Sequence, residues 1–453
     1  VDMYNVAVGY DAGNAVTTGI QNTLIGGLAG DAITTASYNT AVGTSALSNT
    51  TTGINNTAVG RTSLFVNTTG TQNVAIGMDA LQQNSTGSQN TAVGRSALIT
   101  NQTADNNTAL GYAALHANTT GAQNTAVGQA AGDALTVGSY NIALGQNALS
   151  SDTQGSQSVA IGSSALFTQN FTSATATNNT AVGHGAGAAV TTGTQNTFVG
   201  GLAGDGTNDG AECVAVGYLA LSANCGNSNT AVGSNALSQA TGATNTAIGY
   251  YTMGESVTSG NKNTSCGYAA GYAITGGSNN TFLGADAGRT ASPGGNTTTS
   301  SNKLALGDEN VTGAHVQVDW TVASDARDKT DFTALDLGLD FIKALAPVTY
   351  KWDKRSKYGD KKAEGYDLNA QTPDGTHKED WLDIGFKAQE VEALEIAAGY
   401  NKDNKTNLVS SHTDDGKQMG LQYSKFVPIL VKAIQEQQAL IEALTARITT
   451  LEG

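Results

Sequence analysis

The sequence carries little charge. Only 13% of its 453 residues are Asp, Glu, Lys or Arg, where a typical soluble domain has about 25%. The shortage lies in residues 1–323, which hold 5 Lys and Arg against 15 Asp and Glu, whereas residues 324–453 hold 17 and 22. Both parts are therefore acidic and offer no basic face to phosphates, so we expect no nucleic-acid partner. No apolar run approaches the roughly 18 residues that span a bilayer, so no membrane insertion is expected either.

Cysteine is scarce as well, and the acids and histidines form no recognisable site. Cys213, Cys225 and Cys266 are too few, and odd in number, for a disulfide framework. We interpret them as free thiols, with a Cys213–Cys225 bridge as the alternative. The histidines lack metal-ligand spacing, and the acids of residues 1–323 share no position that would pair two carboxylates for glycoside cleavage. We therefore expect no metal and no cofactor.

What is abundant is a repeat. A cassette of the form Asn-x-Ala-aliphatic-Gly first appears at Asn5, returns every 17 residues as far as Ser158, and resumes at Asn179 after an insertion at about 167–177. Since the sequence starts with Val1 instead of an initiator Met, shows no signal peptide and already opens a repeat at Asn5, we expect a fragment or processed chain lacking an N-terminal attachment region. A short fixed period indicates a solenoid in which each coil stacks on its neighbours. The cassettes begin at Asn5, Asn22, Asn39, Asn56, Asn73, Asn90, Asn107, Asn124, Asn141, Ser158, Asn179, Asn196, Cys213, Asn229, Asn245, Asn263, Asn280 and a degenerate Lys303.

Each coil is expected to contain two short strands, because glycines close the cassette and recur near the other end of the unit. With the first cassette residue numbered 0, we predict that the aliphatic +3 side chain lies in the core. Position +8 is either Leu or Gly, and where it is Gly, position +11 becomes aliphatic, as in Gly30 with Ile33. One core slot would thus be filled from two places. The coils at Asn196 and Asn280 break this rule with Thr207 and Ala291, so loose packing is expected there.

The cassette resembles the repeats of trimeric autotransporter adhesin heads and of phage fibre shafts. The resemblance covers about 300 residues and implies that three chains lie side by side in a rod. The fold class expected is mainly β, a parallel β-solenoid of about 17-residue repeats (1–287) forming a trimeric rod. A distal tip segment (288–323) follows, in which Lys303 to Val322 is expected to form a strand, and then a small α+β domain (324–453).

A second resemblance begins at Ser324-Asp-x-Arg-x-Lys329. It continues through Leu339–Trp352, Ile384–Glu392 and Leu421–Gln435, and it is to the C-terminal intramolecular chaperone and auto-processing domain of phage tailspikes and fibres, the endosialidase-type chaperone family. A polar insertion from Lys354 to Asp380 departs from that pattern and is interpreted as a solvated loop.

The resemblance implies that Ser324 is the nucleophile, Lys329 its base, and Ala323–Ser324 the bond that is cut. Attack by the Ser324 hydroxyl on the neighbouring carbonyl is intramolecular. Lys329 can accept the proton only in its neutral form, which burial favours, so we expect Lys329 to be buried on folding. Asp325 and Arg327 complete the motif and are interpreted as an ion pair that supports the loop. The domain would then be a single-turnover serine autopeptidase.

The C-terminal tail shows four heptads and predicts a coiled-coil helix over about 424–452. Ile at a with Leu at d would favour two strands, whereas the resemblance implies three. The a positions are Val427, Ile434, Ile441 and Ile448, and the d positions are Leu430, Gln437, Leu444 and Leu451.

These observations favour a homotrimeric, receptor-binding tail fibre of a bacteriophage, folded by a chaperone that cuts itself off. Its expected place is extracellular, on the virion, with other tail proteins and a glycan receptor on a bacterial surface as partners. The alternative is a bacterial trimeric surface adhesin that binds host glycans.

Overall fold

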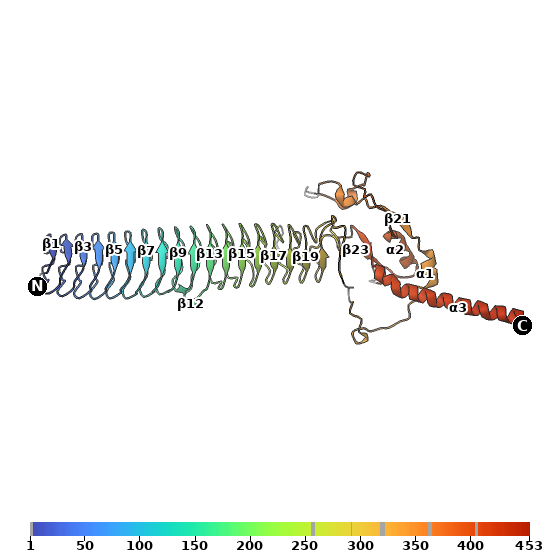
Figure 1. The fold of residues 1–453 in the computed structure, drawn as a ribbon, viewed down its shortest axis with the longest axis horizontal. Coiled ribbons are helices and arrows are strands. Elements are labelled where there is room, and N and C mark those ends of the chain that lie inside the picture. Colours follow the sequence, from blue (N-terminus) through green and yellow to red (C-terminus); the bar gives the residue numbers. More distant parts are fainter. Residues whose placement is uncertain (1–2, 255–258, 291, 318–321, 361–364, 404–405) are drawn as a thin grey trace. The chain divides into compact units, whose positions relative to one another are not determined.

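The computed structural model describes residues 3–254, 259–290, 292–317, 322–360, 365–403 and 406–453. They form two compact units: Val1–Ala285 with Thr298–Leu304, and Asp286–Thr297 with Ala305–Gly453. The first unit is a parallel β-solenoid, seen as a column of short strands in Figure 1. The second contains small antiparallel strand pairs and helices.

Each cassette forms one three-residue strand at positions +1 to +3, which pairs in parallel with the strand of the next coil, as Thr40–Val42 does with Thr57–Val59. The expectation of two strands per coil is wrong for most of the described coils, where turns occupy the second site. Within the described residues, a second strand pair is found at the insertion, where β10, in the coil before it, pairs in parallel with β12, inside it. The strands are β1 (Val6–Val8), β2 (Thr23–Ile25), β3 (Thr40–Val42), β4 (Thr57–Val59), β5 (Val74–Ile76), β6 (Thr91–Val93), β7 (Thr108–Leu110), β8 (Thr125–Val127), β9 (Ile142–Leu144), β10 (Gly155–Ser156), β11 (Val159–Ile161), β12 (Thr175–Ala176), β13 (Thr180–Val182), β14 (Thr197–Val199), β15 (Val214–Val216), β16 (Thr230–Val232), β17 (Thr246–Ile248), β18 (Thr264–Cys266), β19 (Thr281–Leu283) and β20 (Leu304–Leu306).

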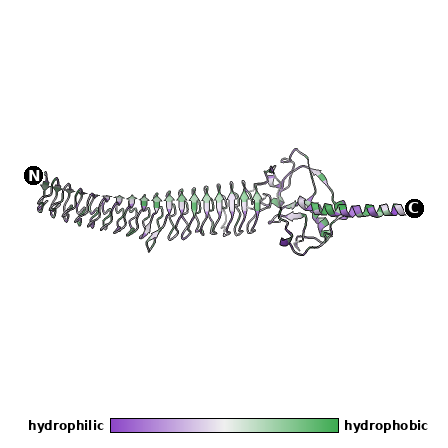
Figure 2. Ribbon diagram, turned by 60° about the horizontal axis from the view of Figure 1, so that its bottom comes forward, coloured by the Kyte–Doolittle hydropathy of each residue, from purple (hydrophilic) through white to green (hydrophobic). Residues whose placement is uncertain are grey.

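The strands place their small middle residue inside and their larger residues outside. The +2 side chains such as Ala58 and Ala75 are fully buried, whereas the +3 side chain of Ile76 is 40% exposed. The prediction that +3 lies in the core is therefore wrong. Alternate strand residues face opposite sides, and in a coil this narrow only alanine-sized groups usually fit between the strand and the facing turn. Figure 2 shows the strand column coloured towards the hydrophobic end of the scale.

The glycine at +4 permits the close stacking of coils. Gly43 has φ +141°, and a Cβ atom there would lie 2.5 Å from the carbonyl oxygen of Gly60 in the next coil. Any side chain at this position would push two neighbouring coils apart, so glycine is required by both conformation and space.

A ladder of buried asparagines at position 0 ties the coils together. In a typical step, Asn124 Oδ1 accepts a hydrogen bond from the Asn141 backbone N–H (2.9 Å). Its Nδ2 donates to the carbonyl oxygen of Gly138 in its own coil (2.8 Å). Each side chain thus satisfies backbone groups that the turns leave without partners. Sequence reasoning used these asparagines only as markers of the period and did not predict their burial.

The prediction that one space in the core is filled from either position +8 or position +11 is confirmed. Residue +8 has a left-handed backbone, with φ of 50° at Leu81 and 58° at Gly132. This conformation suits glycine and costs leucine energy that its burial offsets. A Cβ atom on Gly132 would lie 3.1 Å from the side chains of both Leu115 and Leu135. Leu135, at +11 of the same coil, therefore fills the space that leucine takes elsewhere.

The expected loose packing at the Asn196 coil is wrong. Position +2 of this coil is Phe198 instead of alanine, and its ring is fully buried. A Cβ atom on Gly204 would lie 2.6 Å from that ring, so the ring supplies the volume missing at Gly204 and Thr207. Phe282 is buried in the same way in the Asn280 coil, while Ala291 lies outside the described residues.

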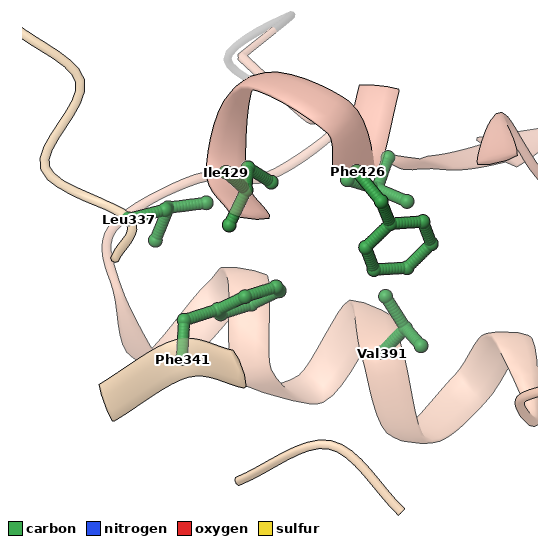
Figure 3. Close-up of a cluster of buried hydrophobic side chains, with 6 residues drawn as sticks. Leu337, Phe341, Val391, Phe426 and Ile429 are labelled. Atoms are coloured by element: carbon green, nitrogen blue, oxygen red, sulfur yellow. The ribbon is translucent and has the colours of Figure 1, made fainter. Parts of the chain in front are cut away.

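The second unit has a hydrophobic core between its helices. Leu337, Phe341, Val391, Phe426 and Ile429 point towards one another (Figure 3). The elements are α1 (Leu339–Ala344), α2 (Ala388–Ala397), α3 (Phe426–Glu452), β21 (Val348–Tyr350) paired antiparallel with β22 (Asp383–Gly385), β23 (Ser410–His412) paired antiparallel with β24 (Met419–Leu421), and the short 3-10 helices η1 (Ala326–Asp328), η2 (Arg355–Lys357), η3 (Leu368–Ala370) and η4 (Tyr423–Lys425).

The predicted strand from Lys303 to Val322 is mostly wrong. Only Leu304–Leu306 is a strand, and the chain from Gly307 to Gln317 has none. Val318 and Trp320, part of the alternating pattern, lie outside the described residues. The remaining alternating residue, Val316, is exposed, so no neighbouring strand or core holds this segment extended.

Candidate active site

The candidate site is the short turn from Ser324 to Lys329. Asp325 caps η1, because its Oδ1 accepts a hydrogen bond from the Arg327 backbone N–H (2.9 Å). The Lys329 backbone N–H donates to the carbonyl oxygen of Ala326 and closes the turn. As a result, residues five apart come together, and Lys329 Nζ donates to Ser324 Oγ at 2.6 Å. The turn brings together the two residues predicted as base and nucleophile.

Asp325 and Arg327 form an ion pair beside this contact. Arg327 Nη2 lies 2.6 Å from Asp325 Oδ2, and Nε donates to both carboxylate oxygens at 3.1 Å. The hydrogen bonds from the Arg327 side chain and backbone lower the pKa of Asp325 below its usual range. The carboxylate thus holds both the η1 backbone and the guanidinium, which gives the turn a defined shape.

Both reacting groups are exposed in the single chain. Every residue from Ser324 to Lys329 is exposed, so the expected burial of Lys329 is not found at the level of one chain. In the observed arrangement Nζ is a donor that orients Oγ. For Nζ to accept the hydroxyl proton, it must first lose its own, which requires surroundings drier than those seen here.

The predicted coiled-coil residues lie along α3. The first turns of this helix bury Phe426, Ile429 and Ala433 in the domain core. The a and d residues lie on another face: Ile434 is 63% and Leu444 is 56% exposed. Also exposed are Val427, Leu430, Gln437, Ile441, Ile448 and Leu451. The helix therefore has a mainly apolar seam that the described residues of its own chain leave exposed.

The polar insertion contributes to an open cleft that sequence reasoning missed. The cleft has a volume of about 850 Å³, and Trp352, Lys354, Arg355 and Trp381 are among the residues that line it. Lys354 pairs with Glu379 (3.5 Å) and lies over the Trp352 ring. The interpretation of the whole insertion as a solvated loop is therefore wrong at Lys354 and Arg355, which are partly buried. The two tryptophans that bracket the insertion were the available signal.

None of the helices in the described ranges is long and apolar enough to cross a membrane. No group of three or more His, Cys, Asp or Glu residues suited to hold a metal ion occurs within those ranges.

Comparison with known proteins bears on the C-terminal part of the chain. Residues 324–400 match a family model described as the chaperone of endosialidase. The match starts at Ser324, the first residue of the turn described above. A search of curated proteins found no match. The chain therefore combines a β-solenoid with a segment similar to this chaperone family.

Proposed function

We propose that this chain is a trimeric, receptor-binding tail fibre of a bacteriophage. Its C-terminal domain assembles the three chains and then cuts the Ala323–Ser324 bond. The observation that carries this proposal is the 2.6 Å contact between Lys329 Nζ and Ser324 Oγ, located where the match to the endosialidase chaperone begins.

The reaction needs only groups of the turn and one water. Ser324 Oγ attacks the carbonyl carbon of Ala323 while Lys329 takes the hydroxyl proton. The bond between this carbon and the peptide nitrogen of Ser324 then breaks, and Lys329 returns the proton to the nitrogen, which leaves as an amine. The product is an ester between Ala323 and the Ser324 side chain, which water hydrolyses. Each chain reacts once, because the nucleophile and the cut bond belong to the same residue.

Assembly supplies the burial that the single chain lacks. Lys329 is exposed in one chain, and packing of neighbouring copies around the turn would favour its neutral form. Cleavage would then follow trimer formation instead of preceding it. The fibre would keep its C-terminal domain until the three chains have assembled.

The outer strand face, formed by the +1 and +3 side chains of the solenoid strands, supports side-by-side packing of copies. No strand from β1 to β20 contains a charged residue. Its +3 side chains are substantially exposed, for example 46% at Leu110 and 41% at Leu283. The +1 row is mostly threonine, so the face is an uncharged surface on which one row of aliphatic side chains runs beside a row of threonines. Exposed aliphatic side chains gathered along one face are typical of an interaction surface.

The seam of α3 supports parallel, in-register pairing. If copies of the chain pair through the same heptads of α3, the corresponding coils of their solenoids are aligned in register. Neighbouring coils are so similar that a slip of one coil would change few contacts, and pairing of long β structures is slow. A terminal coiled coil that sets the register first would remove both problems.

The virion location and the receptor are further parts of the proposal. They rest on the resemblance of the C-terminal segment to domains of phage tailspikes and fibres. The proposed receptor is a glycan on a bacterial surface.

The test is the intact mass of purified wild type, Ser324→Ala, Lys329→Arg and Thr330→Ala. Arginine keeps the positive donor but cannot act as a base. We expect cleavage after Ala323 in wild type and Thr330→Ala, and a full-length chain in the other two. Full-length wild type would refute autocleavage, and cleaved Lys329→Arg would refute the role of Lys329 as base.

A further inference from the structure

One coil of the solenoid differs from its neighbours in its core. The coil that starts at Cys213 has 16 residues before the next cassette at Asn229. Cys213 replaces the asparagine of position 0. It keeps that residue's backbone contact, since its N–H donates to Asn196 Oδ1 (2.9 Å).

The second cysteine of this coil faces the first inside the core. Cys225 Sγ lies 3.5 Å from the hydroxyl of Thr207, the +11 residue of the preceding coil. The sulfur atoms of Cys213 and Cys225 are 3.8 Å apart, and the residues are 0% and 3% exposed. Cys213 thus takes the place of the buried asparagine at position 0, and Cys225 lies beside it in the core.

We propose that Cys213 and Cys225 form a disulfide bond when the chain folds in the presence of a small-molecule disulfide such as oxidised glutathione. The sulfur atoms are already in contact, and bond formation requires an approach to about 2.05 Å. This inference rests on the solenoid alone and is independent of the proposed cleavage.

The chemistry is a thiol–disulfide exchange in two steps. One cysteine of the pair, as thiolate, attacks one sulfur of oxidised glutathione, forms a mixed disulfide and releases one glutathione. The other cysteine, as thiolate, then attacks the protein sulfur of the mixed disulfide and releases the second glutathione. The protein loses two protons and two electrons, and these reduce one glutathione disulfide to two thiols.

The two thiols are hydrogen-bonded to each other in the closed coil. The hydrogen bond from the Cys213 thiol lowers the pKa of Cys225, and the same hydrogen bond and burial raise the pKa of Cys213. Because both groups are buried in the finished coil, the exchange with glutathione belongs to folding, before the core closes, when either cysteine can react first.

The bond would close most of one coil into a covalent ring. Cys213 and Cys225 lie twelve positions apart in a sixteen-residue coil, so the ring would fix the path of the chain through its turns. Cross-links of this kind stabilise chiefly by restricting the unfolded chain. The oxidised coil should therefore open less often than the reduced one.

The experiment uses the full chain with Cys266→Ala, which removes the exposed third thiol. The protein is refolded with reduced and oxidised glutathione, then alkylated in denaturant and weighed intact. We expect no alkylation and a mass lower by two hydrogens, and two alkylated thiols after prior reduction. Two alkylated thiols without reduction, or a glutathione adduct, would overturn the proposal.

A second measurement covers the case in which refolding is incomplete. The Cys266→Ala chain is produced in cells with an oxidising cytoplasm, and thermal unfolding is followed with and without reductant. We expect reductant to lower the unfolding midpoint in this variant. It should leave the midpoint of Cys213→Ser/Cys266→Ala unchanged, and equal shifts in both variants would overturn the proposal.

Discussion

Removing one rung of the asparagine ladder should loosen one coil by a measurable amount. Asn124→Ala takes away the acceptor for the Asn141 backbone N–H and the donor to the Gly138 carbonyl. Position +11 of this coil is Leu135, so no second asparagine replaces the lost donor to Gly138, as Asn118 does for Gly121. Each buried backbone group left without a partner costs about 1–3 kcal/mol, so the coil should lose about 2–6 kcal/mol.

Hydrogen exchange measured by mass spectrometry reports this loss coil by coil. Since 1.4 kcal/mol corresponds to tenfold, amides around Asn141 that exchange by local opening should do so at least about 30-fold faster in Asn124→Ala. Gln129→Ala, an exposed residue of the same coil, is the matched control and should change exchange little. Unchanged protection around Asn141 in Asn124→Ala would refute the view that the ladder holds the coils together.

Three more substitutions probe the solenoid. Leu81→Ala should destabilise its coil by about 2–5 kcal/mol, because Leu81 is fully buried and a cavity would remain. Thermal unfolding checks this, with Gln83→Ala at an exposed position of the same coil as the control. Gly43→Ala should prevent two neighbouring coils from stacking, since the new Cβ would lie 2.5 Å from the Gly60 carbonyl oxygen. Gly27→Ala should be tolerated, because the nearest atom to its new Cβ is 4.0 Å away. The yield of folded protein distinguishes the two variants. Burial raises the pKa of Asp133, so its charged form opposes folding at neutral pH. Asp133→Asn should therefore stabilise at pH 7, and the gain should vanish as the pH falls through the raised pKa to about 3.5; unfolding midpoints at both pH values measure it, and a gain that persists in acid would contradict the assignment.

The length of the repeat and the exchange of core residues between positions +8 and +11 could be predicted from the sequence. Which face of each strand points into the core could not. The 17-residue step and the exchange between +8 and +11 are local regularities, and the pairing of Gly132 with Leu135 confirms them. Alternation alone does not say which face is inside. The width of the coil decides that question, and it puts Ala75 in and Ile76 out.

Polar and aromatic exceptions were missed for a related reason. Asn124 was regarded as a marker of the repeat, although its burial follows from backbone groups that the turns leave unpaired. Phe198 at a position otherwise held by alanine was the sign that a neighbouring glycine had left space. Both signals were present, but each requires the closed geometry of the coil to be interpreted.

At the candidate site, the pairing of residues was predictable and their surroundings were not. The spacing of Ser324 and Lys329 suits a short turn, and the turn brings them to 2.6 Å. The exposure of Lys329 depends on what covers the turn, which the sequence of one chain does not specify.

The central claim, that assembly switches on cleavage, is tested most directly by measuring particle mass and cleavage together in two α3 variants. Ile441→Asp places a charge in the seam, and Ala446→Asp places the same charge on the opposite face of the helix. We predict that wild type and Ala446→Asp elute at three times the 45.9 kDa chain mass or as its cleaved products, whereas Ile441→Asp elutes as an uncut single chain. An Ile441→Asp protein that is a single chain and is cut as fully as wild type would contradict the account.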